Sequence, residues 1–122
     1  MLLPMKIPKP TATARALFDS LVPDDGRAVV KPMFGNFGAF INGNMFMGVF
    51  GADVGLKLVD ADQQALREAG GQPFGPSERS MSGYVALPPE FTQAMAKPWV
   101  DRSINYVGGL PAKTRDKPAK KR

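Results

Sequence analysis

The residue types that most often carry chemistry in proteins are sparse in this sequence of 122 residues. It contains no histidine and no cysteine. Their absence removes the usual ligands of zinc, iron and copper, and both common catalytic dyads, Ser–His and Cys–His. The chemistry that remains open is a serine paired with a lysine, a pair of carboxylates, or an oxygen-ligated magnesium or calcium site.

Two serines in the stretch Ser80-Met-Ser-Gly83 are the candidate nucleophiles. Without histidine, a serine needs a nearby lysine for activation. The spacing around Ser80 and Ser82 fits neither Ser-x-x-Lys nor Gly-x-Ser-x-Gly. Strand and turn positions explain both serines better. We therefore predict no catalytic residue, and a serine-dependent hydrolase is the least favoured alternative.

Two acidic pairs, Asp24-Asp25 and Asp60 with Asp62, could ligate a hard cation. Neither has the alternating ligand series of a calcium loop, and turn and helix-cap positions explain both. The glycines at 35, 38, 43, 48 and 51 lie within and between expected strands, whereas a phosphate loop leads into a helix. The sequence predicts no metal, no cofactor and no small-molecule substrate, and the protein is expected not to be an enzyme.

The net charge of +5 is confined to the C-terminal end. Residues 113–122 hold six basic residues and one acidic residue, while the rest of the chain holds ten of each. Such a stretch, lacking apolar residues, is expected to be a disordered tail over 108–122. Its cations are candidate contacts to nucleic-acid phosphates: Lys113, Arg115, Lys117, Lys120, Lys121 and Arg122. A solvated tail that only adds solubility explains them equally well.

The N-terminal residues 1–10 contain three prolines, which favour an extended leader. No apolar run approaches the roughly 20 residues needed to cross a bilayer, and no signal peptide is visible. Together with the missing cysteines, these features predict a cytoplasmic protein without membrane contact.

The chain is organised around residues 31–50, which are expected to form a β-hairpin. Two apolar runs flank Asn42-Gly43-Asn44, a sequence that supplies the positive φ of a type I′ or II′ turn. Regular two-residue alternation places two apolar sets on opposite faces of this hairpin. One set is Phe37, Ala39, Ile41, Phe46 and Phe50; the other is Phe40, Met45, Met47 and Val49.

Both faces of this hairpin need cover, whereas helices in a two-layer domain cover only one. The second set, Phe40, Met45, Met47 and Val49, is therefore the candidate interface, either for a symmetric homodimer or for another protein. The competing possibility is that residues 91–110 fold across that face within the same chain.

The remaining elements follow from periodicity and turn residues. Residues 11–21 are expected to form a helix, 28–30 a strand that runs into Pro32, and 53–59 a further strand. Asp60 or Asp62 is expected to cap a second helix that ends at Gly70-Gly71. Phe74 is expected to be a buried plug in the following loop, and 79–87 a last strand. Beyond it, two short helices or one helix kinked at Pro98 are expected.

This order, α-β(3–4)-α-β-α, predicts an α+β fold. The expected architecture is a two-layer sandwich of a mainly antiparallel sheet with helices on one face.

Several short motifs, in order along the chain, resemble those of one family. Met33-Phe-Gly-Asn-Phe-Gly38 resembles Met-Phe-Gly-Gly-Tyr/Phe-Gly, and Asn42-Gly-Asn-Met-Phe46 resembles Asp-Gly-x-Met-Phe. Leu56-Lys-Leu-Val-Asp60 is similar to the strand before the family's middle helix. Later segments follow the same order: Pro73-Phe74, Met81-Ser-Gly-Tyr84, Pro88-Pro-Glu90 and Trp99-Val-Asp-Arg102. Over residues 11–107 the chain resembles the TfoX N-terminal domain family, associated with regulators of competence genes.

The resemblance implies an α+β domain over 11–107 and no known catalytic centre. It also implies a regulatory or interaction module that acts in transcription regulation through protein partners. The alternative from the residues themselves is direct, sequence-independent binding of nucleic acid through the basic tail.

Overall fold

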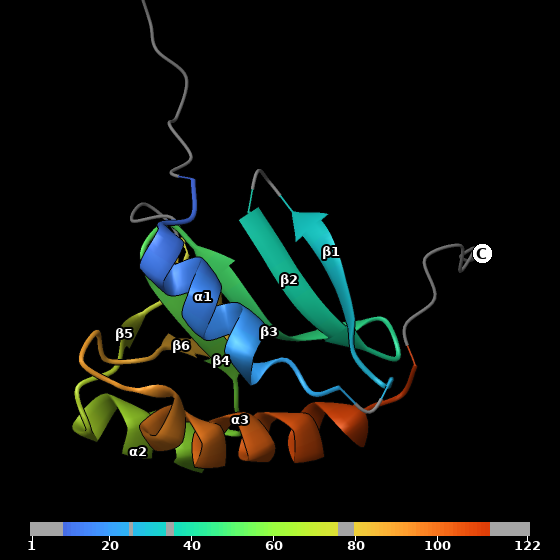
Figure 1. Cartoon of the computed structure of the whole chain (residues 1–122). Helices are drawn as coiled ribbons and strands as arrows, with labels where there is room; N and C mark the ends of the chain where they lie inside the picture. The colour runs from blue at the N-terminus through green and yellow to red at the C-terminus, as the bar shows by residue number, and fades with distance from the viewer. Residues whose placement is uncertain (1–8, 25, 34–35, 76–79, 113–122) are drawn as a thin grey trace, which may run out of the picture.

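A computed structural model describes residues 9–24, 26–33, 36–75 and 80–112. These residues form one six-stranded antiparallel sheet and three helices (Figure 1). The elements are α1 (Ala12–Leu21), β1 (Val29–Met33), β2 (Asn36–Ile41), β3 (Asn44–Phe50), β4 (Asp53–Lys57), α2 (Asp60–Glu68), β5 (Gln72–Pro73), β6 (Tyr84–Ala86) and α3 (Gln93–Gly108). The strand order in the sheet is β1-β2-β3-β4-β6-β5. The predicted α+β class is confirmed, with the short strand β5 as an addition.

The three helices share one face of the sheet. Residues of all three helices belong to one buried cluster, together with residues of β2, β3, β4 and β6. The helical members of the cluster are Ala14, Phe18, Leu21, Leu66, Ala96, Val100, Ile104 and Val107. The prediction of helices on a single face is confirmed. The sheet therefore has a second face that no described helix covers, and we call it the helix-free face.

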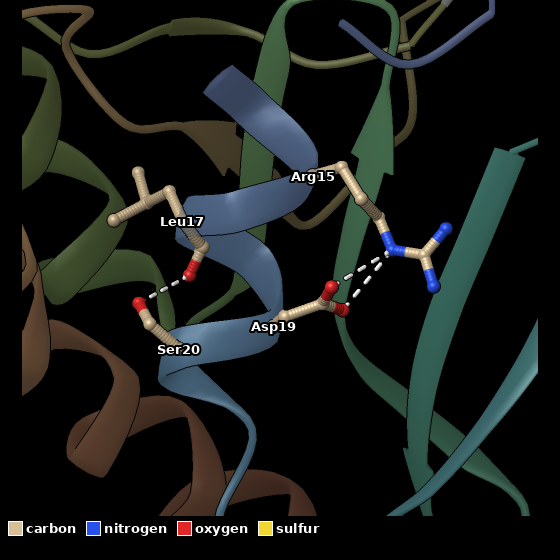
Figure 2. Close-up of polar contacts among 4 residues, drawn as sticks. All are labelled: Arg15, Leu17, Asp19 and Ser20. Atoms are coloured by element: carbon tan, nitrogen blue, oxygen red, sulfur yellow. Dashed lines mark hydrogen bonds and ion pairs between the residues drawn. The ribbon is translucent and has the colours of Figure 1, made fainter. Parts of the chain in front are cut away.

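The first helix begins and ends where its sequence predicts. The Thr11 hydroxyl accepts a hydrogen bond of 3.1 Å from the backbone N–H of Ala14, which satisfies one of the free donors at the helix start. Arg15 Nε on α1 donates a hydrogen bond of 3.0 Å to an Asp19 carboxylate oxygen, drawn as a dashed line in Figure 2. The Arg15 guanidinium also lies 3.9 Å from the centroid of the Phe37 ring, so α1 contacts β2 through a cation–π pair.

The C-terminal segment forms one helix on the covered face. Pro98 lies inside α3, whose start is capped by the Thr92 hydroxyl at 3.3 Å from the Met95 N–H. Since α3 packs against α1, β3 and β4, residues 91–110 do not cross the helix-free face. That competing prediction is wrong for Phe40 and Met45, which lie outside the core cluster, whereas Met47 and Val49 do share that cluster with residues of α3. No helix of the described residues is long and apolar enough to cross a membrane.

The hairpin turn is confirmed, but the predicted faces are wrong beyond it. Asn42 and Gly43 have φ values of 53° and 81°, as a type I′ turn requires. Phe40 pairs with Met45, but Ala39 pairs with Met47, so Phe46 is the extra residue of a β-bulge. The bulge reverses the alternation of β3 beyond Phe46.

Met47 and Val49 consequently lie in the core beneath the helices, with exposed fractions of 0% and 1%. Their assignment to the second face is corrected: of the four predicted interface residues, only Phe40 and Met45 belong to the helix-free face.

Two further expectations around α2 and β6 need correction. Neither Asp60 nor Asp62 caps α2, because the N-cap residue is Val59 and no side chain bonds there. Both aspartates occupy the first turn, where negative charge favours the helix dipole. The last strand spans only Tyr84–Ala86 rather than 79–87. The predicted helix end is confirmed, with Gly70 at φ 112°.

Candidate functional site on the helix-free face

A row of glycines crosses the centre of the helix-free face. Gly38, Gly48 and Gly55 are direct cross-strand neighbours on β2, β3 and β4. Without side chains, Gly48 and Gly55 leave room for Phe74 to pack directly on the sheet backbone, while Gly38 leaves room for Met45 and Phe40. A Cβ atom at Gly55 would stand 2.4 Å from the Phe74 ring, closer than any real contact. The Phe74 ring can pack at this position only because Gly55 has no side chain.

Phe74 covers part of the helix-free face, over Gly48 and Gly55. Its exposed fraction is 1%, so the predicted burial of this residue is confirmed. Its ring centroid lies 6.4 Å from that of Phe50 and 6.1 Å from that of Tyr84. Met45 and Ala86 are buried on the same face and lie outside the main core cluster. The sheet thus has a second, smaller apolar layer beside Phe74.

Next to this layer lies a pocket of about 240 Å³. Its lining comes from the β2–β3 turn, from β4 and from β6 with the turn before it. The lining residues are Phe40, Gly43, Asn44, Met45, Lys57, Met81 and Tyr84. Met45 is the buried member of this set, at 7% exposed, while Phe40, Met81 and Tyr84 are half-buried. The pocket combines an apolar lining with one charged side chain, that of Lys57.

Tyr84 is hydrogen-bonded to the backbone at the edge of this pocket. Its hydroxyl donates a hydrogen bond of 2.8 Å to the backbone carbonyl of Met45, and burial raises the pKa of Tyr84 to about 12. The phenol is therefore neutral at physiological pH and already uses its proton in a bond to the backbone. It shapes the pocket and is poorly suited to act as an acid or base.

Two lysines place positive charge on the helix-free face. Lys57 Nζ lies 5.1 Å from the centroid of the Tyr84 ring, and Lys31 Nζ lies 5.0 Å from that of the Phe40 ring. At this range each ammonium is attracted by the ring. Asp53 lies four residues from Lys57 on β4, at the far end of the face, and burial raises the pKa of its carboxyl. The pocket end of the face is thus its positive end.

The candidate serines are not part of any catalytic arrangement in the described residues. Ser80 and Ser82 are exposed, and neither hydroxyl bonds to a lysine there. Among the described residues, no three acidic side chains come close enough to hold a metal ion. The candidate nucleic-acid contacts Lys113, Arg115, Lys117, Lys120, Lys121 and Arg122 lie outside the described residues.

Sequence reasoning missed five of the seven lining residues. It assigned Gly43 and Asn44 only to the hairpin turn, and it gave no role at this site to Lys57, Met81 or Tyr84. A signal existed for Lys57, because the alternation along 53–57 puts it opposite the core residues Val54 and Leu56. No comparable signal existed for Tyr84, since its position depends on β6 pairing with β4 across an intervening helix. Met81 depends on the same pairing.

The fold and the site define a class: a small α+β domain with a partly apolar surface pocket, in which the described residues assemble no catalytic group. The sequence model of the TfoX N-terminal domain matches residues 17–106. Since the match covers most of the chain, the protein belongs to the TfoX N-terminal domain family. No curated protein and no solved structure matches the chain.

Proposed function

We propose that this protein is a non-enzymatic regulatory module of the cytoplasm that acts in transcription regulation through protein partners. The partner docks on the helix-free face at the pocket beside Phe40 and Met45. Family membership supports a regulatory or interaction role. The docking site rests on one observation, the pocket of about 240 Å³ on the face that the helices leave open.

The size and lining of the pocket favour a protein partner over a cofactor. Sites for drug-sized ligands and cofactors measure roughly 300–1,000 Å³, so this pocket has room for a side chain rather than a cofactor. Methionine side chains adapt their shape to different contacts, and Met45 and Met81 both line it. An apolar, adaptable pocket of this size suits an anchor residue of another protein.

The test is a comparison of transcripts in the cells that carry the protein. The variant Phe40→Ser makes the pocket polar, and Met95→Ser makes the same kind of change on α3, where Met95 is 47% exposed. We expect Phe40→Ser to reproduce the transcript changes of a gene deletion, and Met95→Ser to resemble the wild type. Purified variants are first compared by thermal unfolding, so that loss of the fold is recognised.

Two results contradict the proposal. A deletion that leaves transcripts unchanged contradicts a role in transcription. A deletion phenotype that Phe40→Ser does not share contradicts docking at the pocket. A screen for esterase and phosphatase turnover, with Ser82→Ala as the control variant, tests the non-enzymatic claim: turnover that this substitution abolishes overturns it.

A further inference from the structure

The pocket end of the helix-free face carries charge that the described chain does not neutralise. Within the described residues, Lys57 and Lys31 contact aromatic rings and no carboxylate. Lys97, on α3, instead pairs with Asp101 at 3.2 Å. An apolar pocket flanked by two uncompensated ammonium groups is complementary to an apolar group with acidic neighbours.

The C-terminal end of the described chain lies beside the pocket. Asn44, a lining residue, donates a hydrogen bond of 3.0 Å from Nδ2 to the carbonyl of Pro111. This bond fixes the end of the described chain at the pocket rim. Only Ala112 separates Pro111 from the basic stretch 113–122 with its six cations.

The same contacts disfavour a nucleic-acid base and a second copy of this chain as the occupant. Single-stranded nucleic acid binds by stacking bases on free aromatic faces, but the Phe40 and Tyr84 rings each carry a lysine on one face. Phe74 packs beside Tyr84 at 6.1 Å between ring centroids. In a symmetric dimer built on this face, the pocket of one copy would face the pocket of the other. The lysines of the two copies would repel each other, and neither pocket would be filled.

We propose that the pocket takes an apolar side chain from an acidic segment of the partner protein, with neighbouring carboxylates on Lys57 and Lys31. The inference rests on the proposed function and adds the chemistry of the partner. Lys57 is the specificity-determining residue, because it is the one charged side chain among the described residues that line the pocket.

The test selects binding peptides from a random displayed library against the full chain. We expect enriched peptides to carry one large apolar residue with aspartate or glutamate next to it. Selection against Lys57→Glu should enrich lysine or arginine at those positions. The matched control Lys97→Glu, a charge reversal on α3, should keep the acidic preference. A selected acidic peptide should bind Lys57→Glu at least about tenfold more weakly than the wild type, about 1.4 kcal/mol.

The contact is then located with ¹³C-methyl-labelled methionine. The selected peptide should shift the signals of Met45 and Met81 in the pocket, and leave Met95 on α3 unshifted. Enriched peptides without acidic residues, an unchanged preference on Lys57→Glu, or shifts confined to Met95 each overturn the inference. An oligothymidine that shifts Met45 and Met81 at lower concentration than the peptide also overturns it. A dimer detected by sedimentation also overturns the inference, if the Met45 and Met81 signals shift when dilution dissociates that dimer.

The two proposals fail separately. If acidic peptides fail while Phe40→Ser still reproduces the deletion transcripts, the partner chemistry is wrong and docking at the pocket stands. If Phe40→Ser behaves as the wild type, docking at the pocket is wrong whatever the peptides show.

Discussion

The hydroxyl of Ser103 on α3 donates a hydrogen bond of 2.8 Å to the backbone carbonyl of Phe46, the extra residue of the β3 bulge. Phe46 has no cross-strand partner, because the bulge skips it on the β2 side and the pairing with β4 begins at Met47. Its carbonyl therefore depends on a side chain. On the helix-free face, the Tyr84 hydroxyl donates a hydrogen bond to the backbone carbonyl of the preceding residue, Met45.

Removal of the Ser103 hydroxyl should destabilise the domain by about 1–3 kcal/mol, since a buried carbonyl would lose its partner. Ser103 is 0% exposed, so water does not replace the bond without local opening. The measurement is the free energy of unfolding of Ser103→Ala in urea.

The matched control is Ser20→Ala. Ser20 also lies in a helix, and its hydroxyl bonds to the Leu17 carbonyl at 2.7 Å, but both are at the surface (Figure 2). Its loss should change stability by no more than about 0.5 kcal/mol. Equal effects of the two substitutions would show that the bulge does not rely on Ser103.

Gly55→Ala should destabilise the protein by about 1–3 kcal/mol, because the new methyl group would overlap the Phe74 ring. Gly108→Ala is the control: it lies in the last turn of α3, and a Cβ there meets nothing within 4 Å. That change should stabilise the helix by about 0.5–1 kcal/mol. Combining Gly55→Ala with Phe74→Ala should cost less than the sum of the two separate changes. Additive costs would contradict the packing of Phe74 on the glycine row.

Because the pKa of Tyr84 is raised, we expect the protein to lose stability at alkaline pH. Burial raises the pKa of Tyr84 from 10.0 to about 12, so between these values the unfolded chain loses the proton while the folded protein keeps it bound. The contribution is complete below pH 10 and is lost as the pH rises toward 12. The difference in unfolding free energy between wild type and Tyr84→Phe should therefore shrink over this range.

Direct titration checks the same prediction. Since the chain has two tyrosines, Tyr106→Phe leaves Tyr84 as the only phenol. Its phenolate absorbance should rise with a midpoint near pH 12 in the folded protein. A midpoint near 10 with the fold intact would contradict burial of this side chain.

The elements that the sequence predicts correctly are those set by neighbouring residues. Asn42-Gly43 specifies its turn through positive φ, and the Thr11 cap with the apolar spacing of 11–21 specifies α1. The bulge at Phe46 could not be predicted, because β3 has apolar residues on both of its faces. The hydrophobic pattern therefore fits the strand with or without the extra residue. One extra residue then moved Met47 and Val49 from the predicted interface into the core.

The pocket could be predicted only in part for a related physical reason. Phe40 and Met45 come from the local hairpin, which the sequence specifies. Tyr84 and Met81 come from a segment whose place depends on non-local pairing of β6 with β4. The sequence predicts that Phe74 is buried, but not that its ring packs on Gly55, because that contact also depends on non-local structure.

The basic stretch 113–122 supports a separate prediction about nucleic acid. If it binds DNA, log K should fall by about 0.9 per neutralised phosphate for each decade of salt, and deleting the stretch should abolish binding. The measurement is fluorescence anisotropy of a labelled duplex over a salt series. Binding that the deleted chain retains would refute the stretch as the binding element.

The most direct test of docking at the pocket is photocrosslinking in the cells that carry the protein. A benzoylphenylalanine replaces Phe40 in one variant and Met95 on α3 in the other. We predict a crosslink to a partner protein at position 40, lost when Lys57→Glu is added, and no crosslink to that protein at position 95. A crosslink to that protein at position 95 alone would contradict the docking site. A crosslink at position 40 that Lys57→Glu leaves unchanged would contradict the acidic chemistry of the partner but not docking at the pocket.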